Sequence, residues 1–142
     1  MIIPDANLLL YAYDETSPFH ERAKMWWEGL LSGSETVGLC PSVLFAFIRI
    51  GTNTRAFENP LSSSEAVAIA QEWMHSECLR FLEFTSEDSE RAMSLLKEAG
   101  SGGNLTTDAQ IAATALRFNA SVETADTDFS RLGVDWRNPL HA

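Results

Sequence analysis

Short apolar runs alternate with helical patterns along the whole chain, and this alternation restricts the possible folds more than any other feature. The first apolar run is Met1–Ile3, and a helical pattern over residues 6–13 follows it directly. Later apolar runs, each separated from the next by helical segments, stand at 35–40, 79–82 and 120–125. Such alternation is typical of a mainly parallel sheet with helices on both faces. The sequence therefore predicts an α/β fold.

Local sequence signals predict where the elements begin and end. A further short strand near residues 133–135 would bring the sheet to about five strands. Gly100 is expected to stop the helix before it, because glycine readily adopts the left-handed conformation that ends helices. Helix starts are predicted at four polar residues that precede apolar, helically spaced segments: Ser17 with Pro18 at the first helical position, Ser62, Thr85 and Thr107.

The length of 142 residues is usual for one domain, and we expect residues 1–142 to form a single domain. No apolar run approaches the ~20 residues that cross a bilayer. The N-terminus also lacks the basic segment that precedes the apolar part of a signal peptide. The sequence therefore predicts a cytoplasmic protein with no membrane partner.

Acidic residues outnumber basic ones by twenty to ten, which gives a formal net charge of −10 and a pI near 4.6. Nucleic-acid binders usually carry a basic face, and the lysines and arginines of this chain do not cluster in the sequence. The charge balance therefore argues against a nucleic-acid partner and favours a basic partner or a metal ion.

Four aspartates fall where they are expected to reach one edge of the sheet. They are Asp5 after the first strand, Asp108 near the start of an apolar helix, and Asp126 and Asp128 after the strand at 120–125. Each position also has an ordinary explanation, as a helix cap, as a charge that offsets a helix dipole, or as a turn residue. Because the C-terminal ends of parallel strands lie at one edge, the four carboxylates are nonetheless expected to meet there.

Such a cluster of carboxylates is most readily explained by a metal ion. Like charges within a few ångströms destabilise one another, and a divalent cation removes that repulsion. Oxygen ligands without Cys or His match Mg²⁺ or Mn²⁺. The sequence shows no Ser-His-Asp or Cys-His arrangement and no phosphate-binding glycine loop. The cluster therefore indicates metal-assisted hydrolysis of a phosphate ester.

Five motifs, in order and spread over the whole chain, form a more specific signal. They are Asp5-Ala-Asn7-x-Leu9-x-Tyr11-Ala12, Ser17-Pro18-x-His20 with Ala23 and Trp26, Phe47-x-Arg49-x-x-Thr52-Asn53, Gly103-Asn104-Leu105-x-Thr107-Asp108-Ala109 and Thr124-x-Asp126-x-Asp128-Phe129. In their order, their spacing and the chain length, they resemble the PIN-domain ribonucleases, specifically the VapC-type toxins of bacterial toxin–antitoxin pairs.

The resemblance implies a three-layer α/β/α fold with a twisted, mainly parallel sheet, and an acidic pocket that holds Mg²⁺ or, in its place, Mn²⁺. It implies an endoribonuclease that acts as the toxin of a type II pair, forms a homodimer and is neutralised by a cognate antitoxin protein. Residue by residue, Asp5, Asp108 and Asp126 match the catalytic aspartates, and Asp128 is expected to join them as a metal ligand.

One position departs from the family pattern. Many PIN domains carry a glutamate on the third helix, where this chain has Phe47. Three or four acids remain instead of five, so the binding of a second metal ion is left open. Residues expected to bind substrate or to orient the pocket are Asn7, Arg49, Thr52, Asn53 and Thr124. For Arg49, Thr52 and Asn53 the alternative is a role in ending the helix and forming the turn, while Arg55 and Arg131 are expected near the RNA groove.

Two other functions stay open at this stage. The departure at Phe47 and the low pI would suit a PIN scaffold that has lost catalysis and only binds its partner. Another phosphoryl-transfer α/β domain is the second alternative. A haloacid-dehalogenase-like phosphatase would need Asp-x-Asp after the first strand, where this chain has Asp5-Ala-Asn7. A response-regulator receiver would need a lysine after a late strand, and neither Lys24 nor Lys97 lies there.

Overall fold

The computed structural model describes residues 1–141, and residue 142, the last of the predicted domain, lies outside that range. Five strands form one sheet, and their bounds are Ile2–Pro4 (β1), Val37–Leu39 (β2), Leu79–Phe81 (β3), Ser121–Glu123 (β4) and Trp136–Arg137 (β5). All neighbouring strands are parallel, in the spatial order β3-β2-β1-β4-β5. The parallel sheet confirms the predicted α/β fold.

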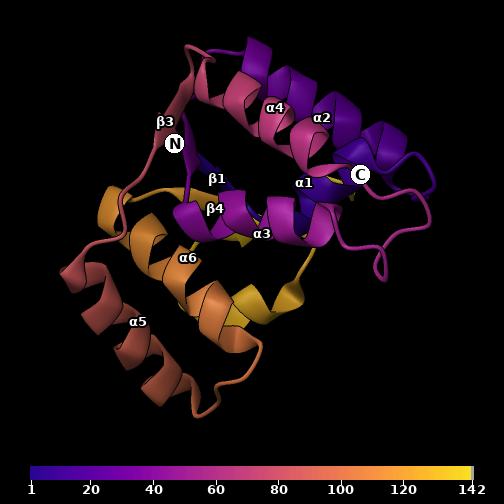
Figure 1. Ribbon diagram of the computed structural model, residues 1–142. Coiled ribbons are helices and arrows are strands. Elements are labelled where there is room, and N and C mark those ends of the chain that lie inside the picture. The colour runs from indigo at the N-terminus through magenta and orange to yellow at the C-terminus, as the bar shows by residue number, and fades with distance from the viewer. Residues whose placement is uncertain (142) are drawn as a thin grey trace.

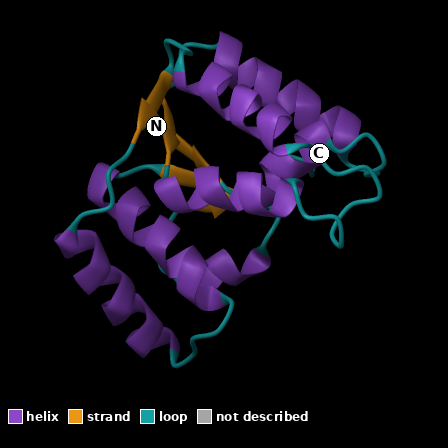
Figure 2. Cartoon of the chain, in the orientation of Figure 1, coloured by secondary structure: helices purple, strands orange, loops and turns teal. Residues whose placement is uncertain are grey.

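Helices cover the sheet on both faces, as Figures 1 and 2 show. Their bounds are Ala6–Tyr13 (α1), His20–Ser32 (α2), Pro41–Gly51 (α3), Ser63–Met74 (α4), Ser86–Ala99 (α5) and Leu105–Phe118 (α6), with a short 3₁₀ helix at Thr127–Arg131 (η1). In Figure 1, α2 and α4 lie on one side of the sheet and α5 and α6 on the other, while α3 contacts both α4 and α6. Within residues 1–141, no helix combines the length and the apolar character needed to cross a membrane.

The core between sheet and helices is apolar and closely packed. Phe47 and Trp73 are both buried, with ring centroids 4.6 Å apart, and the Trp73 indole N–H donates a hydrogen bond to the Tyr13 hydroxyl. Gly38 occupies the middle of β2, where a Cβ atom would stand only 2.6 Å from a methyl carbon of Leu82. A Cβ atom here would displace the side-chain ends of Leu82 and Met1, so glycine lets these side chains pack directly against β2.

The pairing of β1 with β4 determines what stands at the C-terminal edge of the sheet. The register aligns Ile3 with Val122 and Pro4 with Glu123, and the Asp5 N–H donates to the Glu123 carbonyl at 2.9 Å. Both strands end here and run in the same direction, so the residues that follow them leave the sheet side by side. Asp5 is in this way brought next to the segment that carries Asp126.

Several predicted element boundaries are confirmed. Ser62 and Glu65 form a capping box at the start of α4, and Thr85 and Asp88 form another at the start of α5, each with both reciprocal hydrogen bonds. Gly100 ends α5 with φ of 67°, in the left-handed region expected for that position. These local signals therefore act here as they do in isolated helices.

Three predicted boundaries are wrong by two or three residues. Helix α6 does not begin at Thr107, because the N–H groups of Leu105 and Thr106 already bond to the carbonyls of the Gly102–Gly103 turn. Helix α2 does not begin at Ser17-Pro18, since the Ser17 hydroxyl instead accepts from the Phe19 N–H in a separate turn and α2 starts at His20. The last strand is β5, later than the predicted 133–135.

A partly buried ion pair joins α5 to α6. Asp88 is 2% exposed and accepts hydrogen bonds from the Arg117 guanidinium at 2.9 and 3.0 Å. Burial by itself would raise the pKa of Asp88, but the hydrogen bonds from Arg117 and from the Thr85 backbone outweigh it, so that the pKa lies below its ordinary value. The pair therefore contributes to stability at neutral pH and loses that contribution only in acid, as Asp88 becomes protonated.

Replacing Arg117 by alanine is expected to lower the free energy of unfolding by about 2–3 kcal/mol, because it leaves the buried Asp88 carboxylate without its partner. Urea unfolding at pH 7 measures this loss. Arg91, an exposed arginine on α5, provides the control, and Arg91→Ala should change the stability by less than about 0.5 kcal/mol. Equal losses in the two variants would contradict a stabilising role for the pair.

Candidate metal centre

Three carboxylates converge beyond the C-terminal edge of the sheet. One oxygen each of Asp108, Asp126 and Asp128 lies within 4.8 Å of the other two. Asp108 is buried, Asp126 is half-buried and Asp128 is exposed, so the cluster opens toward solvent on the side of Asp128. Of the four aspartates predicted to meet at this edge, these three form the close group.

Asp108 reaches the cluster because it belongs to the inward stripe of α6. Leu105, Asp108 and Ala112 follow one another at helical spacing of three and four residues, and all three are buried. The apolar members of the stripe pack in the core, whereas Asp108 stands in the first turn, where the helix reaches the edge of the sheet. Asp108 is thereby held at a buried position of α6 that would otherwise suit an apolar residue.

Asp126 and Asp128 are held by the turn that follows β4. Asp126 caps η1, and its Oδ1 atom accepts a hydrogen bond from the Asp128 N–H at 2.9 Å. Asp126 and Asp128 thus form the turn considered for an Asp-x-Asp segment, and their carboxylates also approach that of Asp108. The turn fixes the backbone and leaves one oxygen of Asp126 outside that hydrogen bond.

Asp5 lies beside the three clustered carboxylates but is held by other contacts. Its Oδ1 atom accepts from the Ala6 N–H at 2.7 Å, which makes it the N-cap of α1, and its Oδ2 atom accepts from the Thr124 hydroxyl at 2.7 Å. Burial raises the pKa of Asp5, and the charge of Asp126 adds to this effect although the two hydrogen bonds oppose it. The cap interpretation and proximity to the site therefore both hold for Asp5.

The Thr124 hydroxyl is the centre of the hydrogen bonds at this edge. It donates to Asp5 and accepts from the Asp126 N–H at 2.9 Å and from the Asn7 side-chain amide at 3.5 Å. Asn7 Oδ1 also accepts from the Ala125 N–H at 3.4 Å. The fully buried Thr124 thus ties the end of β1 to the end of β4 and orients the Asp5 carboxylate.

The carboxylates of the site strongly affect one another. Burial raises the pKa of Asp108, and the negative charges of its carboxylate neighbours raise it further, to about 8. Asp108 therefore holds its proton more tightly than an ordinary aspartate in the metal-free protein, because a further negative charge would stand unpaired among others. This unfavourable arrangement is one that a bound cation would relieve.

Sequence analysis missed Glu123, which supports the site from behind. This last residue of β4 is fully buried, and its carboxylate accepts from the Trp26 indole N–H and from the Arg137 guanidinium, each at 3.1 Å. It thereby fixes the strand end that precedes Thr124. The available signal was a glutamate inside an otherwise apolar strand, since a charge in that place needs buried partners.

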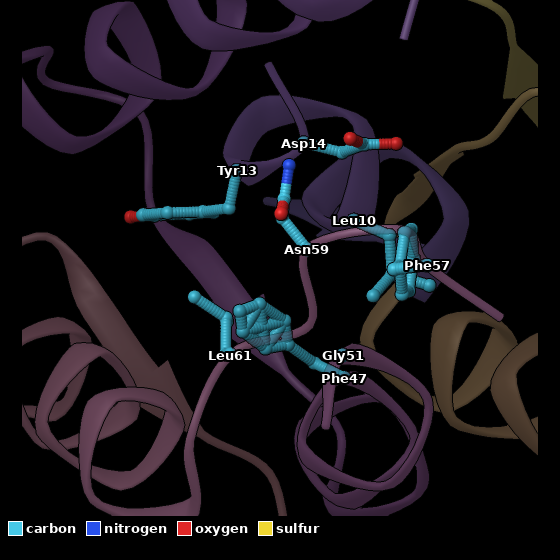
Figure 3. A pocket seen from close by; sticks show the side chains of 8 residues that line it. All are labelled: Leu10, Tyr13, Asp14, Phe47, Gly51, Phe57, Asn59 and Leu61. Atoms are coloured by element: carbon cyan, nitrogen blue, oxygen red, sulfur yellow. The ribbon is translucent and has the colours of Figure 1, made fainter. Parts of the chain in front are cut away.

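Phe47 does not contribute to the acidic cluster. Its ring is fully buried between those of Tyr13 and Trp73, and it lines a small cavity of about 20 Å³ beneath α1. Figure 3 shows the Phe47 side chain beside Leu61 on the wall of this cavity. Helix α3 carries no acidic residue, so it supplies no carboxylate to the site, and its inner face packs in the core.

The other predicted contact residues have different positions. The Thr52 hydroxyl bonds to the Ile48 carbonyl where α3 ends, and the Asn53 side chain accepts from the Arg55 N–H in the following turn. Thr52 and Asn53 thus make the helix-end and turn contacts that were the alternative to substrate binding. Arg49 is exposed and lines a surface groove with Thr107, the neighbour of Asp108.

Arg131 lies at the end of η1, and its guanidinium donates to the Ala99 carbonyl at 3.4 Å. Arg131 thus shares η1 with Asp128, while Arg49 shares a groove with the neighbour of Asp108.

Comparison with known proteins was made by sequence and by structure. Residues 2–135 match the family described as PIN domain. The chain is 38% identical to ribonuclease VapC33 of Mycobacterium tuberculosis over 141 residues, which cover 99% of both chains. It is 36% identical to ribonuclease VapC37 of the same organism, over 98% of this chain and 97% of that protein.

Solved structures with a similar fold include toxins and their complexes. VapC20 of M. tuberculosis, a toxin that cleaves the sarcin–ricin loop, gives a TM-score of 0.73 at 19% identity and covers 94% of this chain and 96% of its own. The FitAcB structure from Neisseria gonorrhoeae gives a TM-score of 0.69 at 22% identity, with all of both chains covered. At these identities the likeness concerns the fold.

The raised pKa of Asp108 predicts how the metal-free protein responds to pH. A carboxyl group whose pKa is higher in the folded than in the unfolded chain favours the folded state in acid. This contribution is lost as the pH rises from the ordinary value of 3.8 to about 8. Asp108→Asn removes the titrating group, so at pH 8 with EDTA the variant should melt several degrees above wild type, at roughly 3 °C per kcal/mol for a chain of this size.

At pH 4 the melting temperatures of wild type and Asp108→Asn should be nearly equal. Asp135→Asn, at an exposed aspartate that is not one of the three clustered acids, should follow wild type at both pH values. A constant difference between Asp108→Asn and wild type across this pH range would show that Asp108 does not titrate as described.

Proposed function

Since the chain belongs to the PIN-domain family, among its VapC ribonucleases, we propose that it cleaves RNA internally with a divalent cation held by its acidic cluster. The observation that carries this proposal is the convergence of Asp108, Asp126 and Asp128 within 4.8 Å, with Asp5 beside them. Repulsion among four acids at one edge opposes folding, and a bound cation would offset this cost.

The donor set fits a hard divalent cation. Each member of the cluster offers a carboxylate oxygen, and oxygen is the ligand that Mg²⁺ and Mn²⁺ prefer. The raised pKa of Asp108 also fits, because a cation would favour its ionised form. We propose Mg²⁺ as the usual ion, bound by Asp108, Asp126 and Asp128 with Asp5, and Mn²⁺ as a substitute.

When bound, such an ion supplies positive charge to the scissile phosphate and lowers the pKa of a water molecule. The residues of the chain perform the remaining tasks. Thr124 and the Ala6 N–H hold the Asp5 carboxylate in one orientation, and Asn7 fixes the backbone at Ala125. With Phe47 in the core, we propose that a single ion bound by these acids is sufficient for binding substrate.

An acidic chain must still hold a polyanion, and a few local cations would serve this purpose. Arg49 stands exposed in the groove beside Thr107, so its guanidinium is placed to meet a phosphate next to the one that is cleaved. We therefore propose Arg49 as a contact to the RNA backbone. The hydrogen bonds of Thr52 and Asn53 favour roles in ending α3 and forming the turn after it.

We propose that the protein acts in the cytoplasm as the toxin of a type II pair and is neutralised by a cognate antitoxin. Structures with this fold include the VapBC-1 complex of Haemophilus influenzae, with a TM-score of 0.63. The net charge of −10 suits a basic partner segment, whose approach an acidic surface accelerates. A homodimer, as implied by the family resemblance, is part of the same proposal.

A scaffold without catalysis is the second candidate, and Phe47 favours it. Because α3 supplies no carboxylate, the site has fewer acids than many PIN domains. The two candidates differ in one measurable property, the divalent-dependent cleavage of RNA by the wild-type chain.

Wild-type protein is expected to cleave a structured RNA in Mg²⁺, and Asp108→Asn or Asp5→Asn to lower kcat/KM by at least about a hundredfold, as removal of one transition-state group usually does. Gel analysis of end-labelled RNA measures the rates, and circular dichroism checks that the variants fold. Asp135→Asn is the matched control and should cleave at the wild-type rate. Full activity in both site variants would exclude this site, and an inactive wild type would favour the non-catalytic scaffold.

Thr124→Val is expected to weaken Mn²⁺ binding by roughly tenfold to a hundredfold, because it removes the hydroxyl that orients Asp5 while keeping the shape of the side chain. Thr124→Ser retains the hydroxyl and should bind Mn²⁺ nearly as wild type does. Isothermal titration of MnCl₂ into each protein measures the affinities. If the valine and serine variants bound equally well, the hydrogen bond to Asp5 would have no part in metal binding.

A further inference from the structure

A cavity of about 230 Å³ lies against the segment that carries Asp126 and is not used by the site described above. Ala125 and Thr127, the two chain neighbours of Asp126, form part of its wall. Tyr11 forms another part and stands one helical turn after Asn7 on the same face of α1. Ala125 therefore belongs both to the wall of the cavity and to the hydrogen bonds around Thr124.

Three aromatic side chains from distant parts of the sequence line this cavity. They are Tyr11 on α1, Phe19 before α2 and Trp136 on β5. The Tyr11 and Phe19 rings are 5.1 Å apart, and Phe19 is 41% exposed, so an apolar ring faces solvent at the entrance. Figure 1 shows the C-terminal end beside α1, where His141 completes the wall.

The wall also offers a hydrogen-bond donor. Asn138 Oδ1 accepts from the Leu140 N–H at 2.9 Å, which leaves the Asn138 amide N–H groups to donate to a bound molecule. In the described part of the chain, no group accepts a hydrogen bond from them or from the indole N–H of Trp136. Flat aromatic walls with amide and indole donors suit a planar heterocycle that carries acceptor atoms.

One cationic side chain lies next to the cavity although the chain is strongly acidic. The Arg22 guanidinium donates to the carbonyl of Leu140, a residue of the cavity wall, at 3.1 Å. Its positive charge suits an anionic ligand such as a nucleotide.

We propose that this cavity binds an unpaired nucleobase of the RNA substrate, next to the phosphate that is cleaved. This inference rests on the proposed ribonuclease function. A nucleotide carries its base a few ångströms from its phosphate, and the wall of the cavity includes both chain neighbours of Asp126. Stacking of unpaired bases on aromatic side chains is the usual means of recognising single-stranded RNA. The volume is below the ~300–1,000 Å³ of pockets for drug-sized ligands, which suits one base.

The first test is an NMR titration of the full chain with each of the four nucleoside 5′-monophosphates, in EDTA. The indole N–H signal of Trp136, assigned with Trp136→Phe, is expected to shift and to saturate at millimolar concentration, while that of the buried Trp73 should stay unchanged. Ribose 5-phosphate, which has no base, should leave the Trp136 signal in place. An unchanged Trp136 signal, or an equal shift with ribose 5-phosphate, would overturn the proposal.

The second test compares RNA cleavage by variants of the cavity and of a matched surface site. Phe19→Ala and Asn138→Ala should each lower kcat/KM about tenfold, mainly through KM, which corresponds to the loss of one base contact. Met25→Ala removes an apolar side chain that is 71% exposed on α2 away from the cavity, and it should leave cleavage unchanged. Equal rates in Phe19→Ala, Met25→Ala and wild type would contradict the proposal.

The two tests separate the failure of this inference from failure of the proposed function. If wild type cleaves no RNA, the proposed function fails, and the mononucleotide titration still decides whether the cavity takes a base. If Phe19→Ala weakens binding of a copurified antitoxin while mononucleotides leave the Trp136 signal unchanged, the cavity is a protein-binding site and the nucleobase proposal is wrong.

Discussion

The parallel pairing of β1 with β4 is the contact on which the acidic site depends. Asp5 and Thr124 are 119 residues apart in the sequence, and only this pairing brings them within 2.7 Å. The register is determined behind them by Ile3 and Val122, which are aligned and fully buried. Because side chains alternate between the faces of a strand, a slip of one residue would turn Thr124 away from Asp5. Burial of apolar side chains thus determines the position of the polar groups at the edge.

The carboxylates of the site lower the stability of the fold that positions them. Asp108 occupies an inward position on α6, and its raised pKa expresses the cost of ionising it among other carboxylates. The aromatic side chains under α1 act in the opposite direction. Phe47 packs at 4.6 Å from Trp73 and adds buried apolar surface to the core, while α3 supplies no carboxylate to the edge. Apolar burial in the core thus offsets part of the cost of the buried acids.

Much of the fold could be predicted from the sequence, because its signals are local. The capping boxes at Ser62 and Thr85 span only four residues each, and the alternation of strands with helices was enough to predict the parallel sheet. The start of α6 was wrong because backbone hydrogen bonds to the Gly102–Gly103 turn, which have no side-chain signature, begin the helix before Thr107. The candidate aspartates could be chosen from their places after strands, and the structure brings three of them together.

What could not be predicted is the set of partners that each side chain finds across the sheet. The sequence shows Glu123 in a strand but cannot show that Trp26 and Arg137 enclose its carboxylate. In the same way, Phe19 and Trp136 share a cavity although more than a hundred residues separate them. Such contacts join residues that are distant in the sequence and come together only in the folded chain. The polar contacts affect stability most, because a buried polar group without its partner costs about 1–3 kcal/mol.

Helix capping and metal binding were treated as alternatives for Asp5, and the geometry shows why they need not exclude each other. A carboxylate has two oxygens with about four acceptor positions, and Asp5 uses one position of each, for Ala6 and for Thr124. Both donors favour the ionised form against the burial that disfavours it. The Ala6 N–H at the start of α1 and the Thr124 hydroxyl therefore hold the Asp5 carboxyl group at the edge in a defined orientation. A carboxylate held in this way would lose little freedom on binding a cation, so capping α1 is compatible with the metal-binding role that we propose for Asp5.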